Sequence, residues 1–155
     1  MDDKKKKGIK VLFLDVDGVV NSKRTVQRTS AGFIGIDPYL SFLVGKIILN
    51  VPDLKVVLSS TWRLWDESTD EVSKRVAPLY GKTPHMPIPG GAEECERGKE
   101  IKAWLDEHTE VVEYAILDDD SDMLPEQMSH FFKTEWATGI TEEIVEKIIA
   151  YFGDK

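Results

Sequence analysis

Two aspartates, one residue apart, stand where a buried strand is expected to end. Asp15 and Asp17 lie in the segment Phe13–Val19, and Gly18 directly after them permits a sharp turn. A turn that starts at Asp15 lets both carboxylates converge on one point. Because clustered anions need a cation or a shared proton, the pair predicts a Mg²⁺ site or a proton-sharing pair of carboxyls, as in phosphoryl transfer. The same residue types also form ordinary solvated turns, so other residues must decide between the two.

Polar side chains also collect at the ends of two other predicted strands. The strand Leu54–Leu58 leads into Ser59-Ser60-Thr61, and the strand Val112–Leu117 leads into Asp118-Asp119-Asp120. In parallel α/β sheets, ligands bind at the carboxyl ends of the strands. We therefore expect these side chains to lie near Asp15.

The elements that must position these residues alternate between strands and helices. Further strands are predicted at Ile9–Leu14 and His130–Phe132, with at best a short edge strand at 85–88. Helices are predicted from Asp37-Pro38 to about Asn50, from a capping box at Ser68–Glu71 to Leu79 or Tyr80 before Gly81, around Ile101–His108, and from the N-cap Thr141 through Phe152. The alternation predicts a Rossmann-like three-layer α/β/α sandwich around a parallel sheet of about five strands.

Length and charge limit the possible functions. The 155 residues fit a single domain, which we place at 9–153 behind a basic tail at 1–8. A formal net charge of −8 argues against a nonspecific nucleic-acid coat. Between Gly18 and Ile36, however, three residues are basic and none is acidic: Lys23, Arg24 and Arg28. This segment is either a solvated loop or a feature that attracts an anionic substrate.

Other classes of protein are disfavoured by what the sequence lacks. No apolar run is long enough to span a membrane, and the single cysteine, Cys95, fits a reducing cytoplasm and offers no CxxC pattern for zinc. A kinase is disfavoured because no GxxxxGK[ST] phosphate loop is present. The histidines have no ligand spacing and receive no chemical role.

Four motifs in this order resemble the haloacid dehalogenase (HAD)-like phosphohydrolase superfamily. They are Leu14–Val19, Val57–Arg63, Arg97–Leu105 and Ile116–Asp122. Each motif is weak alone, but the set is spread along most of the chain. In detail the chain resembles small, capless members akin to the phosphatase domains of nucleic-acid repair proteins of the polynucleotide kinase-phosphatase type. The resemblance implies an enzyme, a phosphatase that hydrolyses phosphoric monoesters.

The resemblance also assigns roles to the aspartate pair. It implies that Asp15 is the nucleophile, which forms an aspartyl-phosphate intermediate. Asp17 would be the general acid for the leaving oxygen and afterwards the base that activates water. Dehalogenases of the superfamily lack the second aspartate, so Asp17 disfavours cleavage of carbon-halogen bonds.

Phosphate-binding residues follow from the second and third motifs. The resemblance implies that Ser59 holds a phosphate oxygen, with Ser60 beside it, and that Arg63 either grips the substrate or supports the site. The third motif usually offers a lysine, and here Arg97 takes that place, with Lys99 as the other candidate. Each of these residues also has a structural alternative, as a cap, a turn or a surface charge.

The implied cofactor is Mg²⁺. Its ligands by resemblance are Asp15, the backbone carbonyl of Asp17, and Asp119, with Asp118 as an outer partner; the register between Asp118 and Asp119 stays open by one residue. Asp122 is a candidate for orienting a bound water.

The substrate class is inferred from the size of the inserted segments. Neither 21–53 nor 64–96 is large enough for a full cap domain, which implies an open site of the kind that accepts nucleic-acid or nucleotide phosphate ends. Trp62 and Trp65 either stack on a base or pack against the protein. The alternatives are a small-metabolite phosphatase of the same superfamily, a receiver-like phosphoacceptor domain, and a noncatalytic phosphate-binding module. The oligomeric state does not follow from the sequence.

Overall fold

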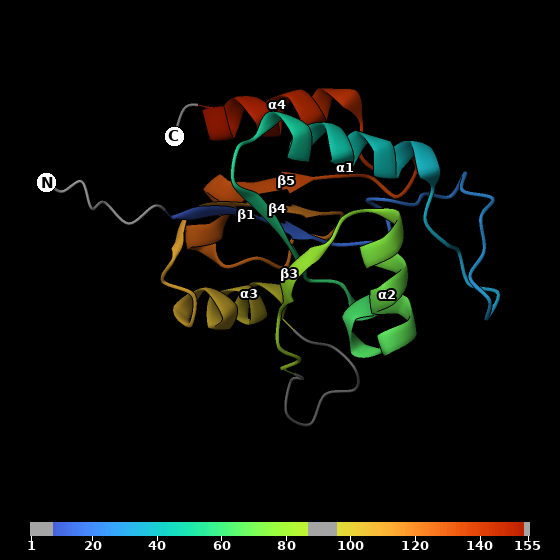
Figure 1. Cartoon of the computed structure of the whole chain (residues 1–155), viewed down its shortest axis with the longest axis horizontal. Coiled ribbons are helices and arrows are strands. Elements are labelled where there is room, and N and C mark those ends of the chain that lie inside the picture. The colour runs from blue at the N-terminus through green and yellow to red at the C-terminus, as the bar shows by residue number, and fades with distance from the viewer. Residues whose placement is uncertain (1–7, 87–95, 154–155) are drawn as a thin grey trace, which may run out of the picture.

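The computed structural model describes residues 8–86 and 96–153 (Figure 1). The predicted tail therefore lies, apart from Gly8, outside the described residues. The elements in chain order are β1 (Ile9–Leu14), α1 (Pro38–Asn50), β2 (Leu54–Leu58), η2 (Thr61–Leu64), α2 (Asp66–Arg75), β3 (Leu79–Lys82), α3 (Arg97–Asp106), β4 (Val111–Asp118), η3 (Pro125–His130), β5 (Phe131–Lys133) and α4 (Glu142–Gly153).

The strands form one parallel sheet in the order β3-β2-β1-β4-β5. β1 is central, and its residues from Val11 to Leu14 are fully buried. Burial on both faces explains why β1 reads as a continuous apolar run rather than as an alternating pattern. The predicted α/β/α sandwich with a five-stranded parallel sheet is confirmed.

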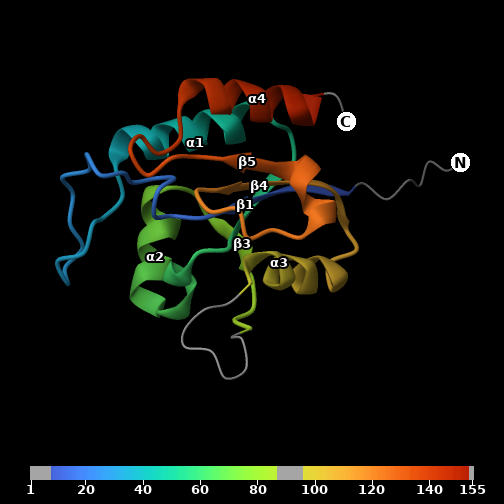
Figure 2. The same ribbon diagram turned by 180° about the vertical axis from the view of Figure 1, so that it is seen from behind.

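Helices cover both faces of the sheet. α1 and α4 lie side by side on one face, and α3 lies on the other (Figures 1 and 2). Successive residues of β1 alternate between these faces: Leu12 belongs to the core under α1 and α4, whereas Phe13 packs with Ile101 and Trp104 of α3. Asp15, two residues after Phe13, continues the face toward α3.

Most predicted elements are confirmed, but the segment from Ser68 to Gly81 differs. α2 begins at Asp66 and ends at Arg75, and Leu79–Lys82 forms β3 at the edge of the sheet. Ser68 is not an N-cap, because its hydroxyl donates to the Trp62 carbonyl at 2.5 Å. Gly81 is not a helix end; a Cβ there would lie 3.3 Å from Trp104 Nε1, so glycine lets β3 pack against that ring.

No strand is formed in the described part of the expected edge strand at 85–88. His85 and Met86 lie outside any strand, and 87–88 fall outside the described residues. Between β1 and α1 and between β2 and β3 the structure contains no cap domain. Among the described residues no helix is long and apolar enough to cross a membrane.

A buried ion pair fastens the segment after β3 to α3. Arg63 Nη2 lies 2.9 Å from Glu100 Oε1, and the side chains are 2% and 0% exposed. Arg63 also donates to the carbonyls of Ser60, Thr83 and Pro84, at 2.7, 2.8 and 3.1 Å. The other Glu100 oxygen accepts from the Met86 backbone N–H at 2.9 Å. The pair thus connects η2, α3 and residues 83–86.

Removing one partner of this pair should be costly. Glu100→Ala leaves the Arg63 guanidinium buried without its carboxylate, and we expect a loss of about 3–5 kcal/mol in the free energy of unfolding, measured by urea denaturation. Lys102→Ala is the matched control, because Lys102 forms an exposed pair with Asp106 on the same helix at 3.0 Å and should cost about 0.5 kcal/mol or less. Equal losses for the two variants would contradict this role of Glu100.

Candidate active site

The parallel register aligns four polar residues at one edge of the sheet. Leu14 pairs with Leu58 and with Leu117, and Leu58 pairs with Lys82. The residues that follow these positions are Asp118, Asp15, Ser59 and Thr83, on four adjacent strands. Residues in such a row share one face of the sheet, here the face covered by α3. The sequence-predicted residues Asp15, Ser59 and Asp118 are therefore brought together.

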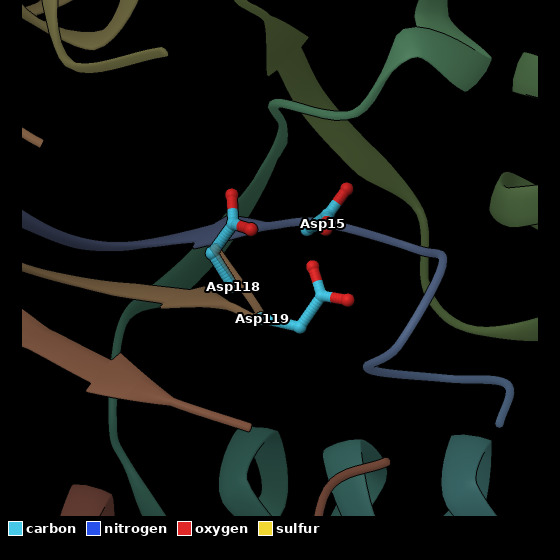
Figure 3. Close-up of side chains that lie close together, drawn as sticks. All are labelled: Asp15, Asp118 and Asp119. Carbon is cyan, nitrogen blue, oxygen red and sulfur yellow. The ribbon is translucent and has the colours of Figure 1, made fainter. Parts of the chain in front are cut away.

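Three carboxylates form a compact cluster at this edge of the sheet. One oxygen each of Asp15, Asp118 and Asp119 lies within 4.8 Å of the others, and the side chains gather where β1 and β4 end (Figure 3). Gly18 makes the approach of Asp119 possible: it has a φ of +85°, and a Cβ there would lie 2.1 Å from Asp119 Oδ2. The glycine after the aspartate pair is thus required by both conformation and space.

Arg97, at the start of α3, is the cation that faces the cluster. Its Nη1 lies 2.6 Å from Asp118 Oδ2 and 3.4 Å from Asp15 Oδ1. Two contacts with Asp122 hold this end of α3, since Asp122 accepts from the Arg97 N–H through its carboxylate and from the Gly98 N–H through its carbonyl. Lys99 lies elsewhere: it pairs with Glu96 at 2.8 Å, and its side chain is 60% exposed.

Burial makes the charges of this cluster costly. Burial first, and then the neighbouring Asp118 carboxylate, raises the pKa of Asp15 well above its usual range, although Arg97 opposes the shift. Burial raises the pKa of Asp118 to about 6, again against the effect of Arg97. For Arg97, burial is outweighed by Asp118 and Asp15, so its pKa is raised and it stays charged. One guanidinium therefore does not fully compensate the carboxylates.

The cluster is suited to a divalent cation. Carboxylate oxygens are the ligands that hard cations such as Mg²⁺ prefer, and a bound cation would oppose the effect of burial, which raises the pKa values of Asp15 and Asp118. The Asp17 carboxylate is not a member of the cluster. Asp120 is exposed, and its Oδ1 accepts from the Ser121 N–H at 2.8 Å.

Two buried hydroxyls in the same row as Asp15 have no hydrogen-bond partner among the described residues. They are Ser59 Oγ and Thr83 Oγ1, and the buried Arg97 Nε shares this property. Buried polar groups are normally satisfied, so such donors in one row indicate a place where an oxygen-rich ligand or ordered water completes the bonding. Ser60 differs, because its Oγ accepts from the Trp62 N–H at 3.1 Å and caps η2.

Asp17 is held at the rim of the site by two N–H donors. Asn21 Nδ2 donates to its Oδ1 at 2.9 Å, and Trp62 Nε1 donates to its Oδ2 at 3.2 Å. Trp62 is 8% exposed, so it is a packed ring with a polar contact to Asp17. The carboxylate itself remains exposed and is oriented from both sides.

Several residues that shape the site were not predicted from the sequence. Thr83 was missed because the segment before it was predicted as a helix rather than a strand. Thr134, which donates from its hydroxyl to the Gly18 carbonyl at 2.6 Å, lies after the short strand β5. Asn21 was missed as well; its Oδ1 accepts from the Gly18 N–H at 2.9 Å.

Comparison with known proteins bears on the family and the fold. The sequence model of a family described as the HAD domain in Swiss Army Knife RNA repair proteins matches residues 11–145. A solved structure from Legionella pneumophila, assigned to subfamily III A of the HAD superfamily of hydrolases, aligns with a TM-score of 0.51 and 15% identity, over 98% of this chain and 87% of that one. At this identity the structural likeness bears on the fold alone. None of the curated proteins matches the chain.

The raised pKa of Asp118 predicts how the free energy of unfolding changes with pH. With no cation bound, its folded pKa of about 6 exceeds the unfolded value of 3.8. Its stabilising contribution is therefore complete below the unfolded value and is lost as the pH rises through about 6. We expect the free energy of unfolding in EDTA to fall between roughly pH 4 and 6, and Asp118→Asn to remove part of that fall.

Binding of Mg²⁺, measured by calorimetry, should strengthen over the same interval, because cation and proton compete for these oxygens. Asp120→Asn is the control, and its stability in EDTA and its Mg²⁺ binding should depend on pH as they do in wild type. Stability in EDTA with the same pH profile in wild type and Asp118→Asn would contradict this assignment.

Proposed function

The chain belongs to the family of HAD domains found in Swiss Army Knife RNA repair proteins, and on this premise we propose that it is a Mg²⁺-dependent phosphatase that hydrolyses phosphoric monoesters. The observation that carries the proposal is the convergence of Asp15, Asp118 and Asp119 at the carboxyl ends of β1 and β4. These are oxygen ligands beside a nucleophile candidate. A cluster of acidic residues does not by itself indicate an enzyme. The proposal of hydrolysis therefore also rests on membership of a HAD family.

Asp15 is the proposed nucleophile. Its carboxylate oxygen attacks phosphorus, an oxygen–phosphorus bond forms, and the bond from phosphorus to the leaving oxygen breaks, which produces an aspartyl phosphate. Arg97 contacts Asp15 at 3.4 Å and thereby favours the ionised, nucleophilic form. Asp15 is 6% exposed, so little water competes with the substrate for this oxygen.

Asp17 is the proposed proton carrier. In the first step it donates a proton to the leaving oxygen, and in the second it accepts a proton from the water that attacks phosphorus. Inorganic phosphate then leaves and the Asp15 carboxylate is restored. The contacts from Asn21 and Trp62 orient Asp17 for both steps.

The phosphate oxygens are proposed to bind Ser59 and Arg97, whose buried Oγ and Nε have no hydrogen-bond partner in the described parts of the chain. Asp15, Asp119 and the Asp17 carbonyl would hold Mg²⁺, with Asp118 supporting them. Bound there, the ion would offset the negative charge of the carboxylates and of the transferring group. No step depends on Lys99, and Arg63 supports the site through Glu100 and residues 83–84.

We extend the proposal to nucleic-acid or nucleotide phosphate ends as substrates. Two facts support this class. The family is described by its occurrence in RNA repair proteins. The segments between the strands that carry Asp15, Ser59 and Thr83 are also short: a loop and α1 lie between β1 and β2, and η2 and α2 lie between β2 and β3. An open site leaves room for a bulky ester. A small-metabolite phosphatase remains the alternative, to be distinguished with a panel of phosphorylated oligonucleotides and sugar phosphates.

The nucleophile is tested by substitution. Asp15→Asn should abolish Mg²⁺-dependent hydrolysis of p-nitrophenyl phosphate, because an amide cannot form the aspartyl phosphate. Asp120→Asn, a change of the same kind on an exposed acid nearby, should retain activity. Steady-state kinetics with and without EDTA measures both, and activity that survives in Asp15→Asn would refute the assignment.

The role of Trp62 is tested through the leaving group. Trp62→Phe keeps the ring but removes the N–H that orients Asp17, so kcat for an alkyl phosphate should fall roughly tenfold. For p-nitrophenyl phosphate the fall should be smaller, because nitrophenolate departs without a proton. Trp136→Phe is the control tryptophan. Equal losses on both esters would indicate that Trp62 acts through packing instead.

A further inference from the structure

A hairpin and η2 both meet the candidate site at Asp17. The hairpin spans 22–36, where Arg28 and Ile34 form an antiparallel bridge and the Thr29 N–H donates to the Phe33 carbonyl at 2.8 Å. Asn21 connects its base to the site, since Nδ2 donates to Asp17 Oδ1 at 2.9 Å and to the Gly35 carbonyl at 3.0 Å. From η2, Trp62 reaches the other Asp17 oxygen.

The outer parts of these two segments are also joined. Ser30, near the hairpin tip, donates to Glu67 Oε2 at 2.9 Å, two residues after Trp65. In Figure 1 the hairpin, drawn in blue, lies beside α2. Hairpin, η2 and the first turn of α2 therefore form one continuous border of the site.

Large apolar side chains stand exposed along this border. Phe33 is 71% exposed, Val26 77% and Trp65 63%. Single exposed apolar residues are ordinary, but here an aromatic ring lies on each of two segments that converge on Asp17. We call Phe33 and Trp65 the aromatic rim.

Charge favours an anionic ligand on the hairpin side. Lys23, Arg24 and Arg28 are exposed, and no acidic residue lies between Gly18 and Ile36, although the protein carries −8 overall. Of the two acids that begin α2, Asp66 follows Trp65 directly, and Glu67 accepts from Ser30 near the hairpin tip. In a bound polyanion, the phosphates would therefore lie along the hairpin and the uncharged faces would lie against Trp65.

We propose that the aromatic rim stacks on the bases of a single-stranded, terminally phosphorylated nucleic acid, while the hairpin cations contact its backbone. This inference rests on the proposed phosphatase function and adds the element that selects the substrate. Aromatic rings beside a basic track are the chemistry that binds single strands without sequence preference. A duplex keeps its base faces stacked inside, so the rim discriminates against it.

The test compares wild type with Phe33→Ala and Trp65→Ala. The substrates are a short single-stranded oligonucleotide with a 3′- or 5′-terminal phosphate, the same strand annealed to its complement, and p-nitrophenyl phosphate. Each variant should lower the ratio of kcat/KM for the single strand to kcat/KM for p-nitrophenyl phosphate by about 5- to 100-fold, mainly through KM. Phe42→Ala, an aromatic ring on α1 that is 60% exposed, should leave the ratio unchanged.

Salt dependence tests the backbone contact separately. Lys23→Gln should reduce the slope of log(kcat/KM) against log[salt] for the oligonucleotide by about 0.7, whereas Lys55→Gln, on the exposed side of β2, should not. The proposed role of the aromatic rim would be refuted if the ratio of kcat/KM values for the single strand and p-nitrophenyl phosphate stayed within about twofold of wild type in both rim variants. Equal kcat/KM for single strand and duplex in wild type would also refute it. If wild type hydrolyses p-nitrophenyl phosphate without favouring oligonucleotides, the inference fails and the phosphatase proposal stands; if it hydrolyses neither, both fail.

Discussion

The central constraint on this molecule is the proximity of two buried carboxylates. Asp15 and Asp118 end neighbouring strands, both lose hydration, and burial raises the pKa of each. Arg97 lies against both but contributes a single positive charge. Burial disfavours the charged form of both carboxylates, and Arg97 offsets only part of that cost. The site is therefore suited to a cation and to an anionic group brought in with it.

The rest of the fold creates and supports that proximity. Parallel pairing of β1 with β4 places the two carboxylates at the same level of the sheet, and pairing with β2 places Ser59 beside them. α3 packs on the same face and contributes two charges from adjacent turns: Arg97 toward the carboxylates and Glu100 toward Arg63. The Arg63–Glu100 pair therefore determines where η2 and residues 83–84 lie around the site.

Sequence reasoning was sufficient wherever a local pattern agreed with the tertiary structure. β2 was predicted residue for residue, since a run of β-formers between Pro52 and a polar triplet has few alternatives. β3 was missed because Leu79–Lys82 is short, half-exposed and contains Gly81, whose role depends on contact with Trp104. For the same reason the partner of Arg63 and the contact between Trp62 and Asp17 could not be predicted: both join segments distant in sequence, which only the folded sheet brings together.

The most direct test of the account is to trap the covalent intermediate. Enzyme mixed with Mg²⁺ and a phosphate ester, quenched in acid within a turnover and digested, should yield a peptide that carries one phosphoryl group on Asp15, as identified by tandem mass spectrometry. With p-nitrophenyl phosphate, whose leaving group needs no proton, the Asp17→Asn variant should accumulate this species, because water is no longer activated to hydrolyse it. Turnover without any phosphorylated Asp15 peptide in either protein, or with the group on another residue, would contradict the account.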